Sequence, residues 1–175
     1  MGRWRCDSRP ATCRSGFSLA AESGNPYLRV YAQACRGLCH AIAGRGSAAI
    51  EDLSKALSFA RSRKAGLENE PRILADLAHV YLQIGDTASA ASIISEASEV
   101  ATARHARIAE CLARIVRAEL LLRSQTGDQQ AEGVLELERA SALIEETGAR
   151  IFEPVLNSAK QVKEERQAAS RRTVI

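Results

Sequence analysis

Three residues that could bind a metal or react with an oxidant lie close together in the sequence: Cys35, Cys39 and His40. A spacing of four residues places the two cysteines on one face of a helix, whereas His40 lies on another face. A structural zinc site needs four ligands, and the chain offers no second pair with ligand spacing. We therefore interpret the cysteines as small apolar residues of a helix, and we expect no metal and no other cofactor.

The sequence motifs that usually mark an active site are missing. The chain has no phosphate loop of the GxxxxGK type, no GxGxxG after a strand, no HExxH and no GxSxG. We therefore expect no catalytic residue and a protein that is not an enzyme.

A row of polar side chains recurs at steps of four, three and four residues: Arg72, Asp76, His79 and Gln83. This spacing places all four on one face of a helix. Such a face is either a ligand surface in a concave groove or an ordinary solvated face, and the sequence does not decide between the two.

The corresponding row about 40 residues earlier is apolar: Tyr31, Cys35, Leu38 and Ile42. It either binds an apolar side chain of a partner or packs under a preceding part of the fold. The candidate partner-binding residues are therefore Tyr31, Leu38, Ile42, Arg72, Asp76, His79 and Gln83.

The element that must position these rows repeats along the chain. One copy of the spacing is Gly37, Gly44, Ala49, Leu53 and Ala56. It is matched by Ala78, Gly85, Ala90, Ile94 and Ala97, and with a longer turn by Ala118, Gly127, Gly133, Leu137 and Ala140. A period of about 40 residues built from two helical patterns is typical of an α-solenoid, in which each unit stacks on its neighbours.

The chain is predicted to be all-α, with about three helix pairs and a C-terminal capping helix. We place these helices at about 26–43, 48–64, 71–84, 88–104, 107–124, 130–147 and 152–170. Residues 1–16 fit no repeat and are predicted to be a disordered or irregular leader. The helical domain then covers 17–170, and residues 171–175 form a flexible tail.

Composition fits this architecture. Hydrophobic residues make up 46% of the 175, but aromatic residues only 4%, so alanine and aliphatic side chains must pack helices set close together. No apolar stretch approaches the roughly 18 residues that a membrane span needs, so we expect no membrane partner. Five cysteines at unpatterned spacings indicate a reduced, cytoplasmic protein.

The charge distribution gives little support to a nucleic-acid partner. The formal charge is only +3. Two basic clusters stand at helix ends, where cations suit the helix dipole: Arg61, Arg63 and Lys64, and Arg104, His105 and Arg107. Many nucleic-acid sites have aromatic residues interleaved with the basic ones, so that bases can stack on them. Neither of these clusters has such aromatic residues. We expect a protein or peptide partner instead.

The second copy of the spacing resembles the tetratricopeptide repeat (TPR), on these residues: Leu77, Ala78, Tyr81, Gly85, Asp86, Ala90, Ile94 and Ala97. The first copy departs from the pattern at His40 and the third at Leu121 and Gly133. The stretch 103–122, ARHARIAECLARIVRAELLL, is similar to the C-terminal repeat regions of bacterial adenylate/guanylate cyclase-like and ATPase-type transcriptional regulators.

The resemblance implies a non-catalytic protein-protein interaction scaffold that binds a peptide or a partner domain in a groove. The alternative that it implies is a regulatory C-terminal tail, possibly truncated, of a bacterial signal-transduction protein. A solenoid needs a cover at both ends. Only a short helix remnant precedes Val30, Leu38 and Ile42. We expect a second copy, the leader or an upstream segment to cover them, and favour a symmetric dimer.

Overall fold

The computed structural model describes residues 18–20 and 22–173. Across these residues the regular structure is helical and contains no strand, which confirms the predicted all-α class. The helices after residue 25 are α2 (Pro26–Ile42), α3 (Gly46–Arg63), η1 (Leu67–Asn69), α4 (Glu70–Gln83), α5 (Thr87–Ala103), α6 (Arg107–Leu122), α7 (Gly127–Thr147), η2 (Arg150–Phe152) and α8 (Glu153–Thr173).

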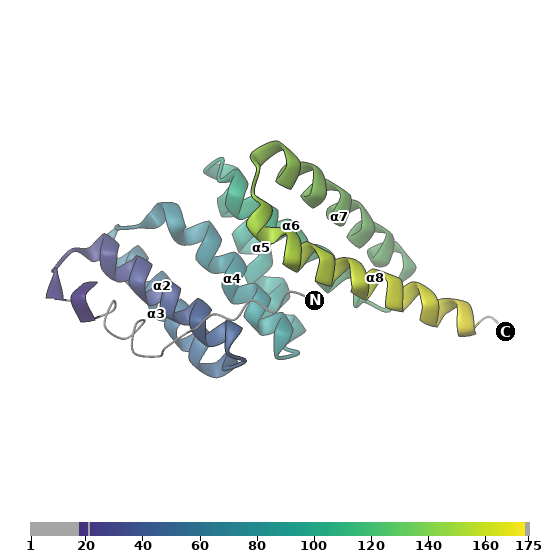
Figure 1. Cartoon of the computed structure of the whole chain (residues 1–175), viewed down its shortest axis with the longest axis horizontal. Helices are drawn as coiled ribbons and strands as arrows, with labels where there is room; N and C mark the ends of the chain where they lie inside the picture. Colours follow the sequence, from purple (N-terminus) through teal and green to yellow (C-terminus); the bar gives the residue numbers. More distant parts are fainter. Residues whose placement is uncertain (1–17, 21, 174–175) are drawn as a thin grey trace.

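Most of the packing joins helices that follow one another in the chain (Figure 1). The closest associations are α2 with α3, α4 with α5 and α6 with α7, and each pair also contacts the next. Helix α8 lies against α6 and α7. Helix α4 packs along α6, whereas α2 makes only slight contact with α4. The chain is therefore more open between α2 and α4 than between α4 and α6.

Small residues bring the paired helices close together. An added Cβ at Gly37 would lie 2.8 Å from Cγ of Leu53 and 3.2 Å from its backbone nitrogen, so α2 and α3 meet where there is no room for a side chain. Ala78 and Ala90 are completely buried between α4 and α5. The repeated small residues are thus packing positions.

Local signals set the helix ends. The side chain of Asn25 accepts hydrogen bonds from the backbone amides of Tyr27 and Leu28, and Pro26 occupies the first turn of α2. Gly85, after α4, has a φ of +85°, which glycine adopts without strain. These residues explain why α2 begins and α4 ends close to their predicted limits.

Four boundaries differ from the prediction by two residues or more. One is the end of α6, which comes two residues earlier, at Leu122. Helices α3 and α7 begin two and three residues earlier, at Gly46 and Gly127. The prediction placed turns at these glycines, but glycine is tolerated in the first turn of a helix. Helix α8 continues to Thr173, so the predicted tail 171–175 begins as helix. The predicted leader 1–16 lies outside the described residues.

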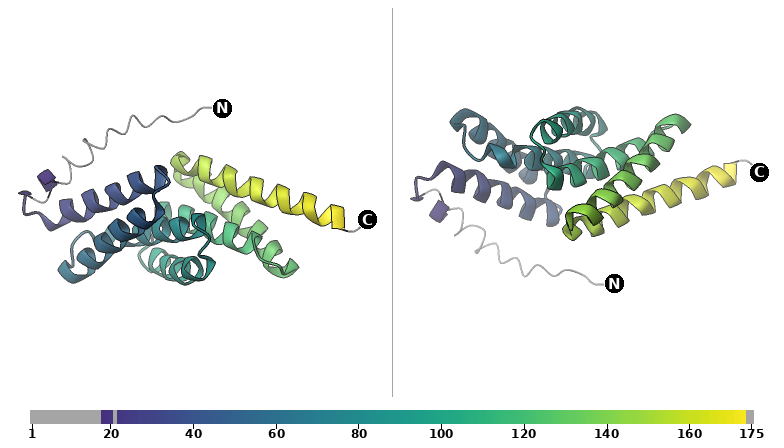
Figure 2. Two further views of the ribbon diagram at one scale, coloured as in Figure 1. Left: turned by 90° about the horizontal axis from the view of Figure 1, so that it is seen from below. Right: turned by 90° about the horizontal axis from the view of Figure 1, so that it is seen from above.

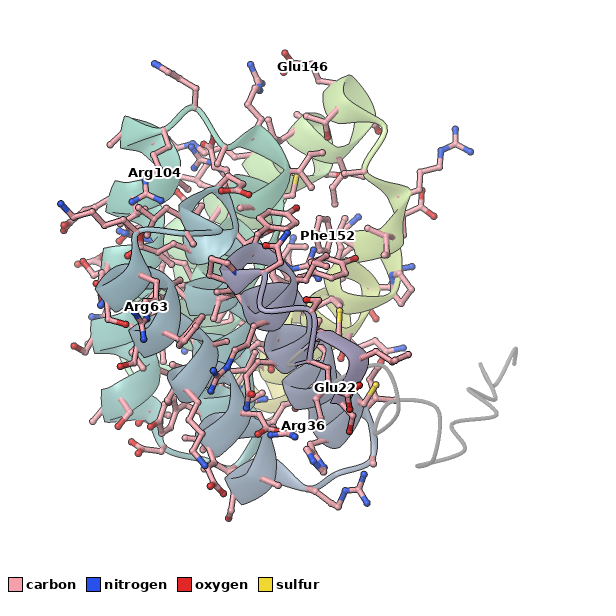
Figure 3. The ribbon with its side chains drawn as sticks, turned by 90° about the vertical axis from the view of Figure 1, so that its left-hand side faces the viewer. Glu22, Arg36, Arg63, Arg104, Glu146 and Phe152 are labelled. Atoms are coloured by element: carbon pink, nitrogen blue, oxygen red, sulfur yellow. The ribbon has the colours of Figure 1, made fainter. Side chains whose placement is uncertain are left out.

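A buried carboxylate ties three helices together. Glu70, at the start of α4, is nearly fully buried and accepts a hydrogen bond from Arg61 of α3 at 2.6 Å and another from Arg104, which follows α5. Figure 3 labels Arg104 at this junction. Burial opposes ionisation of Glu70, but the two arginines outweigh it and hold its pKa below the ordinary value. The ionised form therefore stabilises the packing of α3, α4 and α5.

A candidate partner-binding groove

An open groove of about 190 Å³ lies between α2, α4 and the start of α8. Its lining residues are Leu38, Ala41 and Ile42 from α2, Arg72, Asp76, His79, Val80 and Gln83 from α4, Leu112 from α6, and Ile151, Phe152 and Val155 from η2 and α8. Six of the seven candidate residues line it, and Tyr31 is the exception. The groove thus brings together two rows that are about 40 residues apart in the sequence.

Six lining residues were not among the candidates: Ala41, Val80, Leu112, Ile151, Phe152 and Val155. The last three come from η2 and α8. Gly148 ends α7, and the short helix η2 follows before α8 begins. Two residues of η2 line the groove. Figure 3 labels Phe152. A large aromatic residue just after a helix-ending glycine was the available sequence signal, because aromatic residues are scarce in this chain.

The charged pair in the groove is Arg72 and Asp76. Nε of Arg72 donates to the Asp76 carboxylate at 2.8 Å, and its guanidinium carbon lies 4.8 Å from the centroid of the Phe152 ring. Asp76 is only 6% exposed. Burial raises its pKa to about 6, against the opposing attraction of Arg72. The solvated-face alternative is therefore wrong for Asp76.

The neutral polar groups of the groove are His79 and Gln83. His79 is half-buried and Gln83 is exposed, with their nitrogens Nε2 3.4 Å apart. Burial lowers the pKa of His79, and Arg123 lowers it further while Glu119 opposes the shift. An uncharged imidazole has one donor and one acceptor nitrogen. His79 and Gln83 can therefore form hydrogen bonds with a ligand's backbone without adding charge.

The groove walls are apolar and accessible. Ile42 on α2 and Ile151 on η2 are each 73% exposed, and Leu38 is half-buried beside Ile42. Concave sites with apolar walls and a few convergent polar groups are the usual form of a binding site. The arrangement can hold an apolar side chain between two helices.

Tyr31 lies nearer the start of α2 and is 55% exposed. Tyr27, one turn before it, is 42% exposed. With Leu38 and Ile42, the two tyrosines share one face of α2, and we call these four residues the α2 stripe. The stripe covers nearly the whole length of α2 and ends in the groove.

The cysteine–histidine cluster offers no metal centre in the described part of the chain. Cys35 and Cys39 are half-buried on α2, while Nε2 of His40 lies 3.5 Å from the carboxylate of Asp52 on α3. Within residues 18–20 and 22–173, no group of three His, Cys, Asp or Glu residues could hold a metal ion.

Three arginines of the two basic clusters form ion pairs within the chain. Arg61 pairs with Glu70 and Glu96, and Arg104 also pairs with Glu70. Arg107 contacts Glu146 at 2.5 Å. Glu70 is buried, so its two pairs hold helices together, whereas Arg107 and Glu146 form an exposed pair that contributes little.

No protein-family model, curated protein or solved structure matches the chain. The similarity to tetratricopeptide repeats thus depends on the residues and spacings described above. None of the described helices combines the length and the apolar character that crossing a bilayer requires.

Proposed function

We propose that this chain is a non-catalytic protein-protein interaction scaffold that binds a peptide or a partner domain in the groove between α2, α4 and the start of α8. The observation that carries the proposal is the convergence of two exposed isoleucines, Ile42 and Ile151, around His79 and Gln83. Apolar walls supply affinity by excluding water, and convergent polar groups fix orientation.

We also propose that the three helix pairs form a TPR-like solenoid, with α8 as its C-terminal cap. Sequential packing of α2–α3, α4–α5 and α6–α7 supports this assignment (Figure 2). The close contacts at Gly37 and Ala78 support it as well, because they occupy equivalent places in the repeat. In such a fold α2, α4 and α6 line the inner surface, where tetratricopeptide domains bind their ligands.

A buried carboxylate in the groove fits a binding role. The ionised form of Asp76 is destabilised by burial, and functional sites often contain such groups at a cost in stability. Arg72 neutralises Asp76 when both are charged. The groove therefore suits a segment whose inserted part is apolar and uncharged.

A second candidate is the regulatory C-terminal tail of a bacterial signalling protein, such as a nucleotide cyclase or an ATPase-type transcriptional regulator. The exposed α2 stripe favours it, because an upstream repeat would cover such a face. An in-frame coding sequence upstream of Met1 would support this candidate, and a stop codon there would exclude it.

The groove can be tested with peptides selected from a random display library on the immobilised full chain. We expect selected peptides to have an apolar anchor, and their affinity to fall at least tenfold in Gln83→Ala and Ile42→Asp. Leu135→Asp is the matched control, because Leu135 is an exposed aliphatic residue on α7 that does not line the groove. Peptides that bind all variants equally would place the site elsewhere.

A further inference from the structure

The α2 stripe exposes apolar surface beyond the part that lines the groove. Tyr27, Tyr31 and Ile42 are 42%, 55% and 73% exposed along one face of the same helix. No helix in the described residues packs extensively on α2 apart from α3, which lies on another face. Continuous apolar faces of this kind usually mark an interaction surface.

The first described residues lie near the start of α2. Residues 18–20 form a helical turn, and the backbone amide of Ser23 donates to the carbonyl of Leu19 at 2.9 Å. The hydroxyl of Ser23 donates to the carbonyl of Ala20 at 2.8 Å and accepts from the amide of Asn25. Figure 2 places the turn next to the start of α2, on the side away from α3.

The seventeen residues that precede Ser18 are long enough to cover the stripe. From Tyr27 to Ile42 the helix rises about 22 Å at 1.5 Å per residue. Seventeen residues cover about 25 Å as a helix and more than twice that distance when extended. Trp4, near the far end of this segment, lies 14 residues before Ser18, which is about 21 Å as a helix and more than twice that when extended. An extended segment can therefore bring Trp4 to the groove.

The same segment carries a suitable anchor. Trp4 is the only tryptophan of the chain, and aromatic side chains bury large apolar areas with little loss of conformational entropy. A covalently attached segment acts at an effective concentration in the millimolar range. Even a weak intrinsic affinity for the groove is then enough to occupy it.

We propose that residues 1–17 bind along the α2 stripe of their own chain and place Trp4 in the groove. The segment is then an intramolecular competitor that a partner must displace, an inference that rests on the proposed function. In this proposal, residues 1–17 cover the α2 stripe, and a second copy of the chain does not.

Trp4 fluorescence tests the proposal in the full chain. We expect emission at shorter wavelengths than that of free tryptophan, protection from acrylamide quenching, and no change across a wide dilution series. Ile42→Asp should shift the emission to longer wavelengths and raise quenching several-fold. Leu135→Asp, the control on α7, should leave both unchanged. Because Ile42 and Leu135 are both exposed, circular dichroism should show that both variants fold.

Three results would overturn the proposal. Solvent-like emission in the unchanged chain would mean that Trp4 is not bound. Protection from quenching that disappears on dilution would assign the stripe to a second copy. Protection from quenching that survives Ile42→Asp would place Trp4 elsewhere. None of these results removes the groove as a peptide site. Selected peptides that bind without changing Trp4 emission would likewise separate the two proposals.

Discussion

Replacing Asp76 with asparagine should stabilise the fold at neutral pH. The carboxylate is 6% exposed, and its principal partner is the Arg72 guanidinium at 2.8 Å. Its pKa of about 6 lies above the ordinary value of 3.8, because the loss of hydration outweighs the attraction of Arg72. Asparagine has nearly the same shape and carries no charge, so it avoids the cost of burying an ion.

The magnitude follows from the two pKa values. The difference between 3.8 and about 6, at about 1.4 kcal/mol per pKa unit, makes the ionised folded state less stable by about 3 kcal/mol. Because the folded pKa is the higher one, the folded chain binds more protons between pH 3.8 and 6, and stability falls as pH rises through that range. Above pH 6 this loss is complete.

Urea unfolding of the wild type and of Asp76→Asn, at pH values below 3.8 and above 6, measures the effect. The variant should gain about 1–3 kcal/mol relative to the wild type above pH 6, and the two should converge below pH 3.8. Arg72 remains over the Phe152 ring in the variant. A variant that is less stable above pH 6, or a difference that does not change with pH, would refute the reasoning.

Two further predictions concern the packing that holds the groove in place. Glu70→Gln should destabilise the fold by about 1–3 kcal/mol in urea unfolding, since it weakens the contacts to Arg61 and Arg104. Its pH dependence is opposite to that of Asp76, because the lowered pKa makes the Glu70 contribution largest above the ordinary carboxyl range. Gly37→Ala should lower stability by about 1–3 kcal/mol in thermal unfolding. Gly127→Ala is the control and should cause no such loss, because nothing lies within 4 Å of its added methyl group. Equal losses in the two variants would contradict the close approach of α2 and α3.

The sequence was sufficient for the helices and for the rows of side chains. A helical period places Arg72, Asp76, His79 and Gln83 on one face whatever surrounds them, and the small residues at fixed spacing predict close helix pairs. Local signals such as Asn25 and Gly85 set several ends. These features depend on residues near one another in the chain.

What the sequence could not give is the environment of those rows. Asp76 was expected on an accessible row of side chains. In the structure, Phe152 of η2 packs against Arg72 of α4, and Asp76 is buried. Tyr31 shares a face with Ile42 yet lies outside the groove, since α2 makes only slight contact with α4. Both outcomes depend on the packing of segments that are far apart in the chain, which local periodicity does not encode.

Buried carboxylates between paired helices were missed for the same reason. Asp52 on α3 accepts hydrogen bonds from Gln33 and Arg36 of α2, and Glu136 on α7 accepts one from Arg114 of α6. Each carboxylate immediately precedes the large aliphatic residue of its repeat. The signal could have been found by comparing the first and third repeats position by position.

Site-specific photo-crosslinking tests the central claim that the groove is the interaction surface. A benzophenone side chain placed at Gln83, which is exposed in the groove, is compared with one at Leu135 on α7, each in the full chain incubated with a peptide selected by display. We expect the peptide to crosslink at Gln83 and not at Leu135. Crosslinking at Leu135 alone, or equally at both positions, would contradict the account.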